Sequence, residues 1–234
     1  MTADRADVRV DLVVESANPE RLGEFWAALL ERPVRQGAGA CTVAVTPSAV
    51  LEFRTAAAPG GETSRHHLDV ASTSSAHQAS LVARAQELGA CETDIGQGRV
   101  PWQVMTDPDG NAFCILEPRS EYRDSGPLAA LVTHVRDPQV TARFWSALLA
   151  TPVAHRHPDY VSLRPGETGP ALEFVRHPDP PRNPGRTHVR VLRSDRPAHP
   201  VDDRGEVRHC RVCGPSCVVV SDPERNDVCL APLR

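Results

Sequence analysis

The sequence TDPDGNAFCILEP at residues 106–118 returns near the other end of the chain as SDPERNDVCLAPL at residues 221–233. Both copies begin with an Asp-Pro turn, continue as an alternating apolar strand, and place a cysteine at the same position after the turn. This correspondence indicates an internal duplication. A repeat that is overlooked leads to the wrong fold for the whole chain, so it has to be traced first.

Three further pairs of segments carry the duplication through most of the chain. The members of each pair have the same length and share residues at corresponding positions: NPERLGEFWAALLERPV (18–34) with DPQVTARFWSALLATPV (137–153), VLEFR (50–54) with ALEFV (171–175), and RHHLDV (65–70) with RTHVRV (186–191). The chain is therefore predicted to contain two homologous domains, residues 1–121 and 122–234. Their boundary lies in RSEYRDSGP (119–127), where Gly, Pro and charged residues replace the periodic apolar pattern.

The composition is that of a soluble globular protein large enough for two domains, with 234 residues, 40% apolar and 24% charged. The first residues lack the apolar segment of a signal peptide, and no stretch approaches the roughly 20 apolar residues of a membrane span, so a cytoplasmic location is expected. The seven cysteines are expected to be reduced there. Because the net charge is -4 and Lys and Arg are scattered, the expected partner is a small molecule, not a nucleic acid or a membrane.

Each half divides again into two similar units. Residues 8–15 alternate as a strand, Asn18 is a favourable helix N-cap with Pro19 at the first helical position, and apolar residues then recur at helical spacing. Short strands follow before the pattern restarts at His67, with a second helix expected near residues 75–88. Each half is therefore predicted to consist of two βαβββ units of about fifty residues.

These segments resemble, in this order, the vicinal oxygen chelate superfamily, which includes glyoxalases, bleomycin-resistance proteins and extradiol dioxygenases. The resemblance rests on the strand followed by NPERLGEFW, on the RHHLDV strand and on the DPDGN hairpin, and it covers nearly the whole chain. It implies an α+β fold of two tandem glyoxalase-like domains, in each of which paired βαβββ units form a curved, half-open sheet. Helices would cover the convex side, and a ligand, often with a divalent metal, would occupy the concave cup.

The alternation of apolar and polar residues predicts which side chains face the cup. Apolar residues must pack against the helices, so Leu51 and Phe53 are expected on the convex face and Glu52, between them, in the cup. The same rule collects titratable groups on one concave face: Asp11, Glu15, Glu52, His67, Asp69 and Cys114. Because burying unpaired charge is costly, these groups must be solvated, paired or bound to a cation.

The resemblance places metal ligands at four of these positions, namely Asp11, Glu52, His67 and Cys114. Two carboxylates and an imidazole suit Fe, Mn, Ni or Zn, with an open position for a substrate oxygen or water. Cys114 departs from the family, which usually carries Glu there, and is either a thiolate ligand or a small buried apolar residue. A metal-free polar pocket is the alternative to a metal site.

The second half retains less of this pattern. The four corresponding positions carry Ala130, Glu173, His188 and Cys229, so the first ligand is missing. Residues 194–207, where the fourth helix is due, contain two prolines and a glycine that prevent a regular helix. The second domain is therefore predicted to be partly degenerate, and the working site is expected in the first domain.

HCRVCGPSC, at residues 209–217, gathers a second set of potential ligands: His209, Cys210, Cys213 and Cys217. C-x-x-C is the spacing of zinc knuckles and of thioredoxin-like redox motifs, but no helix follows as the redox motif requires. A structural zinc would be useful in a domain that has lost a helix. The alignment of the two turns argues against a zinc site, because it places Cys217 at the position of Trp102. Trp102 is expected to face the helices, so Cys217 would lie on the opposite side of the sheet from Cys229.

Three classes of function remain. The first is a metal-assisted lyase, isomerase or dioxygenase in which Glu52, His67 and Asp69 carry the catalysis. The second is a protein that sequesters a small molecule such as an antibiotic, as bleomycin-resistance proteins do, and the third is a metal-free acid/base cyclase or epimerase. In each class, further residues are expected to contact the substrate: Glu15, Arg54, Arg65, Glu173 and His188. The chain is expected to be a monomer with paired domains or a homodimer.

Overall fold

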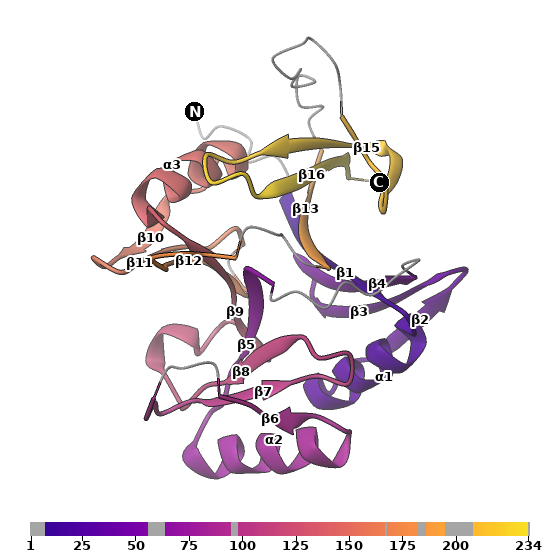
Figure 1. Cartoon of the computed structure of the whole chain (residues 1–234), viewed down its shortest axis with the longest axis vertical. Helices are drawn as coiled ribbons and strands as arrows, with labels where there is room; N and C mark the ends of the chain where they lie inside the picture. Colours follow the sequence, from indigo (N-terminus) through magenta and orange to yellow (C-terminus); the bar gives the residue numbers. More distant parts are fainter. Residues whose placement is uncertain are drawn as a thin grey trace.

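The computed structural model describes residues 8–55, 64–94, 98–166, 168–181, 186–194 and 208–233. This part of the chain contains two curved eight-stranded sheets and three α-helices (Figure 1). Sheet A contains, in spatial order, β14 (His209–Cys210), β15 (Gly214–Ser221), β16 (Asp227–Pro232), β13 (Thr187–Arg193), β1 (Val8–Ser16), β4 (Ala49–Thr55), β3 (Ala40–Thr46) and β2 (Val34–Gly37). Sheet B contains β10 (Val153–Arg156), β11 (Tyr160–Leu163), β12 (Ala171–Arg176), β9 (Leu128–Val135), β5 (His66–Val70), β8 (Ala112–Ile115), β7 (Gln103–Thr106) and β6 (Cys91–Glu92).

Helices α1 (Pro19–Leu30) and α3 (Pro138–Leu149) begin and end in the same way, as expected for repeated segments. The side chains of Asn18 and Asp137 accept hydrogen bonds from backbone amides of the first turn, and a proline follows each cap. Each helix ends at a residue in the left-handed region, with φ of 54° in α1 and 49° in α3. The predicted cap and start of α1 are confirmed, and α2 (Ser75–Glu87) also lies where the sequence predicts a helix.

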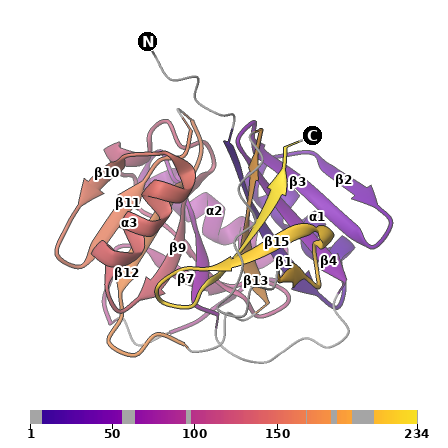
Figure 2. The ribbon, with the colours of Figure 1, turned by 90° about the horizontal axis from the view of Figure 1, so that it is seen from above.

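The two sheets do not correspond to the two halves of the sequence. We number the βαβββ units in chain order, so that unit 1 contains β1 to β4, unit 2 β5 to β8, unit 3 β9 to β12 and unit 4 β13 to β16. β1 pairs antiparallel with β13, and β5 pairs antiparallel with β9. Sheet A therefore joins units 1 and 4, and sheet B joins units 2 and 3 (Figures 1 and 2). The α+β class and the tandem repeat are confirmed, but each half contributes one unit to each sheet instead of building its own.

The two units of each half contact each other through a helix and a turn. Trp26 of α1 donates from its indole nitrogen to Asp107, in the turn of unit 2, at 3.2 Å. Trp145 of α3 donates to Asp222, in the turn of unit 4, at the same distance. Both aspartates also accept hydrogen bonds from backbone amides of their own turns. The repeated Asp-Pro turn is thus a structural device that closes the hairpin and fixes it to a helix of the preceding unit.

The convex faces of both sheets contribute to one hydrophobic core. Leu51 and Phe53 from sheet A belong to the same buried cluster as Leu68, Val70 and Phe113 from sheet B. The residues between them along each strand face away from this core, so the predicted alternation is confirmed. Because the sheets meet through their convex sides, their concave faces form two separate cups.

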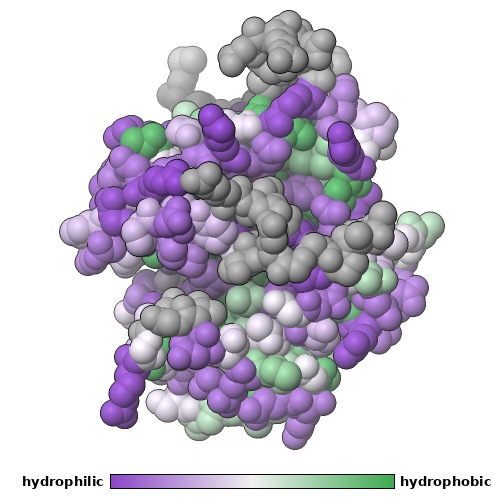
Figure 3. All heavy atoms as spheres, viewed as in Figure 1, coloured by the Kyte–Doolittle hydropathy of each residue, from purple (hydrophilic) through white to green (hydrophobic). Residues whose placement is uncertain are grey.

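The described helices are short and are accompanied by one turn of 3-10 helix, η1 (Ser120–Tyr122). None of the described helices is long and apolar enough to cross a membrane. The face of the molecule in Figure 3 is largely hydrophilic, with smaller hydrophobic areas between the polar side chains. The prediction that residues 194–207 form no regular helix falls almost entirely outside the described residues.

Candidate functional site

Cup A, the concave face of sheet A, contains two of the predicted metal ligands. Asp11 and Glu52 are buried, and both accept hydrogen bonds from Arg190, which lies opposite Asp11 on the neighbouring strand β13. The bond from Arg190 to Asp11 measures 2.7 Å. Arg9 forms a second ion pair with Asp11, and Arg54 forms one with Glu52. The two acids are therefore already paired with cations supplied by the chain.

The arginines of cup A keep Glu52 ionised and hold a loop against the sheet. Burial by itself raises the pKa of Glu52, but the hydrogen bonds and charges of Arg190 and Arg54 outweigh burial, so the pKa is lowered. Arg54 also donates to the backbone carbonyl of Val212, in the loop between β14 and β15, at 2.8 Å. Asp11 and Glu52 are thus parts of a structural ion-pair network.

Cup B, the concave face of sheet B, contains the other members of the predicted metal site. His67 and Asp69 lie on β5, and Cys114 lies beside Asp69 on β8. One ligand atom from each of the three lies within 4.8 Å of the others. The prediction that these residues share one cup with Asp11 and Glu52 is corrected, because units 1 and 2 belong to different sheets. The alternation was assigned correctly for β1, β4, β5 and β8, but the partner of each unit was not.

The three residues of cup B fit a divalent metal ion by their donor chemistry. His67 Nε2 lies 3.4 Å from Asp69 Oδ1, and that buried oxygen has no hydrogen-bond partner among the described residues. Imidazole, carboxylate and thiolate are all ligands of Zn²⁺, and three protein ligands leave a coordination position open. Burial, followed by the charge of Asp69, raises the pKa of Cys114, so an ion that binds here must displace the thiol proton.

Cup B also encloses a cavity of about 300 Å³. Strand pairing aligns His67, Val132 and Glu173 in one row across β5, β9 and β12, so Glu173 lies on the same concave face as the three potential ligands. The other polar and aromatic side chains that line the cavity come from units 2 and 3 and from the segment between them: Trp102, Arg119, Tyr122, His134 and Tyr160. The cavity is therefore built by both halves of the chain.

Glu173 is the acid with the clearest electrostatic signature in cup B. Its side chain is buried and accepts a hydrogen bond of 2.8 Å from the Tyr122 hydroxyl. Burial raises the pKa of Glu173, with a further contribution from the charge of Asp69, although the Tyr122 hydrogen bond acts in the opposite direction. A carboxyl whose pKa is moved toward neutrality inside a cavity is suited to transfer a proton. Tyr122 belongs to η1, in the segment that the sequence predicts as the domain boundary.

The remaining walls of the cavity are aromatic and cationic. The Arg119 guanidinium lies 5.4 Å from the centre of the Trp102 ring and forms an ion pair with Glu117. The His134 ring lies 5.2 Å from that of His67, and burial together with the neighbouring His67 and His177 lowers the pKa of His134 to about 4, so it is neutral at pH 7. The sequence prediction that Trp102 faces the helices is corrected. Only the pairing of units 2 and 3 brings these side chains together.

The predicted substrate contacts are divided among several places. Glu15 lies on sheet A in register with Arg54, which is bound to Glu52. Arg65 is buried and donates hydrogen bonds to oxygens in the turn of unit 4. His188 lies in cup A beside several thiols. Of the five predicted substrate contacts, Glu173 alone lines the cavity of cup B, as far as the described residues show.

A larger cavity, of about 570 Å³, lies between the end of α1, the start of α2 and η1. Charged residues on its wall such as Glu31 and Arg123 are exposed to solvent. Cup B is smaller but gathers buried titratable groups around one cavity. Convergent polar groups in a concave site indicate function better than volume does, so cup B is the candidate functional site.

Comparison with known proteins agrees with this architecture. The family model for the glyoxalase-like domain matches residues 11–116 and 130–231. Glyoxalase I from Zea mays superimposes with a TM-score of 0.65 and 14% sequence identity over 97% of this chain and 93% of its own. A putative dioxygenase from Bacillus subtilis superimposes with a TM-score of 0.58 and 13% identity over 98% of this chain and 86% of its own.

At these identities the two structures show a common fold and nothing further about activity. No curated protein matches the chain. The family model, in contrast, covers most of the chain in two successive matches, one in each half of the sequence repeat. The resemblance to the vicinal oxygen chelate superfamily is thereby confirmed, and the chain belongs to the glyoxalase-like domain family.

Proposed function

We propose that the chain is an enzyme that moves a proton on a small organic molecule bound in cup B, in a reaction of the lyase or isomerase type. The observation that carries this proposal is the arrangement of Glu173, with its raised pKa, on the same cavity wall as His67, Asp69 and Cys114. A protein that only sequesters a ligand has no need of a buried acid held by a tyrosine hydroxyl beside a set of potential metal ligands.

Each residue of cup B has a role in this proposal. A divalent ion held by His67, Asp69 and Cys114 would supply a Lewis acid for neighbouring oxygens of the substrate. Glu173 takes a proton from the substrate and returns it, while the Tyr122 hydroxyl holds the carboxylate in position. The buried position of Glu173 limits the access of water to the proton that moves.

The cavity also favours a class of substrate. A volume of about 300 Å³ is at the lower end of the range for small-molecule sites. Trp102 and Tyr160 offer flat apolar surfaces, and Arg119 offers a positive charge. These walls favour a small planar molecule with an anionic oxygen, and an ion held by His67, Asp69 and Cys114 would favour a second oxygen next to it.

The cytoplasmic location expected from the sequence is part of the proposal, and seven free thiols agree with a reducing compartment.

Three probes of this class test the reaction type. Protein loaded with Zn, Mn, Fe or Ni is incubated with phenylglyoxal, mandelate or catechol, and the products are followed by NMR in deuterated water and by oxygen consumption. We expect conversion of phenylglyoxal or deuterium exchange of mandelate, and no oxygen uptake with catechol. Oxygen uptake would instead identify a dioxygenase. Thermal stabilisation by a probe without any conversion would replace the enzyme with a binding protein.

Replacing Tyr122 with phenylalanine should raise the pKa of Glu173 further. The Tyr122 hydroxyl donates to the ionised form of the carboxylate, so its removal favours the protonated form and shifts the pKa upward. Carbon-13 NMR of labelled glutamate carboxyls across a pH series measures this shift directly. An unchanged or lowered pKa would show that Tyr122 does not control the proton of Glu173.

A further inference from the structure

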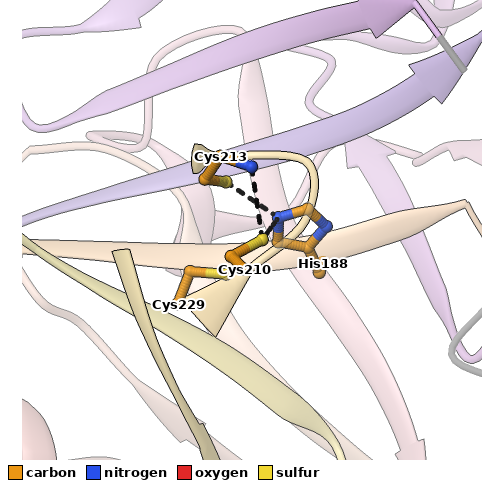
Figure 4. Close-up of side chains that lie close together, drawn as sticks. All are labelled: His188, Cys210, Cys213 and Cys229. Carbon is orange, nitrogen blue, oxygen red and sulfur yellow. Dashed lines mark hydrogen bonds between the residues drawn. The ribbon is translucent and has the colours of Figure 1, made fainter. Parts of the chain in front are cut away.

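A second group of potential metal ligands lies in cup A, away from the cavity of cup B. His188 on β13, Cys210 on β14, Cys213 in the following loop and Cys229 on β16 point toward one another (Figure 4). One ligand atom from each residue lies within 4.8 Å of the other three. Three segments that are separate along unit 4, namely β13, β14 with its following loop, and β16, therefore meet at one point.

The spacing of these four residues is close to that of a tetrahedral site. His188 Nε2 lies 3.1 Å from Cys213 Sγ and 3.8 Å from Cys210 Sγ. Ligands about 2.3 Å from a zinc ion through sulfur, or about 2.0 Å through nitrogen, are about 3.5–3.8 Å apart at tetrahedral angles. The side chains would therefore need only small movements to bind a single ion.

The donor atoms of this group suit a zinc ion. The backbone amide of Cys213 donates a hydrogen bond to Cys210 Sγ at 3.3 Å. Three soft sulfur ligands with one imidazole form a set that selects zinc over the harder divalent ions.

The loop that carries Cys213 is held in place independently of any ion. Arg54, whose guanidinium also binds Glu52, donates to the Val212 carbonyl next to Cys213 at 2.8 Å. Leu192 and Ala231 pack around the thiols in a small buried cluster. The ligands are therefore preorganised by sheet A, which reduces the entropy that ion binding would have to overcome.

This grouping corrects the set of ligands predicted from the local sequence. His209 is exposed and is not part of the group. Cys217 is buried next to the group, and its Sγ atom lies 3.8 Å from the Cys213 carbonyl oxygen. Cys217 packs with Cys229 in one cluster, so the prediction that they lie on opposite faces is also corrected. The C-x-x-C pair, Cys210 and Cys213, is completed by His188, 22 positions before Cys210, and by Cys229, 16 positions after Cys213. A local sequence motif could not indicate ligands at these distances.

We propose that His188, Cys210, Cys213 and Cys229 bind one zinc ion that has a structural role in unit 4. Units 1, 2 and 3 each pack a helix against their sheet, whereas the described part of unit 4 contains strands alone. The ion joins β13, β14 and β16 across cup A and so stabilises the unit that lacks this support. It is distinct from the ion of the proposed reaction in cup B.

Cobalt substitution tests the proposal without any assay of activity. Tag-free protein is reduced, stripped with a chelator and titrated with Co²⁺ and then with Zn²⁺. We expect a thiolate-to-cobalt charge-transfer band and the intense visible absorption bands of tetrahedral Co²⁺. Both should disappear as Zn²⁺ displaces Co²⁺. Removal of zinc should lower the melting temperature by about 10 °C, since an ion bound far above its dissociation constant contributes strongly to stability.

Matched variants identify the ligands. C213S should weaken zinc binding at least about 100-fold, whereas C217S, which changes the adjacent buried thiol, should bind like the wild type. H67A, in cup B, should keep the tetrahedral cobalt spectrum and so separates this site from that of the proposed reaction. If C213S does not fold, H188C serves as the second variant, because a fourth thiolate should strengthen the charge-transfer band.

Three results of the cobalt titration would overturn the proposal. They are the absence of a thiolate band in the reduced wild type, loss of that band in C217S or H67A, and an unchanged band in H188C. A disulfide between Cys210 and Cys213 that persists under the same reducing conditions in place of metal binding would overturn it as well.

Discussion

Replacing Glu173 with glutamine should reduce turnover in cup B by a factor of about 10²–10⁴, the usual contribution of a positioned acid or base. Glutamine keeps the shape of the side chain and can still accept the Tyr122 hydrogen bond, but it cannot exchange a proton. The loss should appear in kcat, measured with the probe that the wild type converts, while the melting temperature stays close to that of the wild type. The predicted effect thus concerns the chemical step and not the fold.

The matched control is Glu52→Gln, at the related position in cup A. Glu52 and Glu173 occupy equivalent places in the sequence repeat and both lie on concave faces. Glu52 is bound by Arg190 and Arg54, whereas Glu173 lines an open cavity. We therefore expect Glu52→Gln to change turnover by less than about twofold. Equal losses in the two variants would show that cup B has no special role.

Strand alternation allowed the faces of residues in β1, β4, β5 and β8 to be predicted from the sequence. The rule depends on the identity of neighbours within one strand, so it worked for Glu52 and for Asp69 without knowledge of the sheet. The helix signals are also local, and the Asn18 cap is an example. Trp102 was misplaced because its strand parity was assigned toward the helices, whereas Trp102 lines cup B and packs in one cluster with Val104, two residues later.

The membership of each cup could not be predicted in the same way. All four units open with a similar strand, and any of these strands could pair with the opening strand of another unit. The choice depends on contacts between distant segments, such as Trp26 with the turn at Asp107. A site made from units 2 and 3 therefore combines residues that the sequence repeat assigns to different domains.

The cysteine that follows each repeated turn illustrates the same limit. Cys114 and Cys229 occupy the same position in their hairpins, and both face a cup. Cys114 meets Asp69 and His67, while Cys229 meets His188, the thiol of Cys210 on β14 and the thiol of Cys213 in the following loop. The chemistry of each cysteine depends on the side chains that neighbouring strands and loops place beside it. Alternation within one hairpin does not predict those neighbours.

Replacing Arg190 with methionine should destabilise the fold by about 3 kcal/mol, because the change leaves Asp11 and Glu52 buried without their shared cation. Arg9 and Arg54 remain, but their side chains are 31% and 32% exposed and compensate only in part. For a chain of this size the melting temperature should fall by about 6–12 °C. Denaturant unfolding of the wild type and the variant measures the free-energy difference.

Two further variants separate the cost of unpaired charge from the loss of packing. Arg84→Met removes an arginine from an exposed pair with Glu31 and should cost less than about 0.5 kcal/mol. The triple variant Arg190→Met, Asp11→Asn, Glu52→Gln removes the cation and both charges together, so it should recover most of the lost stability. If Arg190→Met were no more harmful than Arg84→Met, cup A would not be held by its ions. A triple variant as unstable as Arg190→Met would mean that Arg190 acts through packing. The difference between cup A, whose acids are paired with arginines, and cup B, whose acid lines a cavity, would then need another explanation.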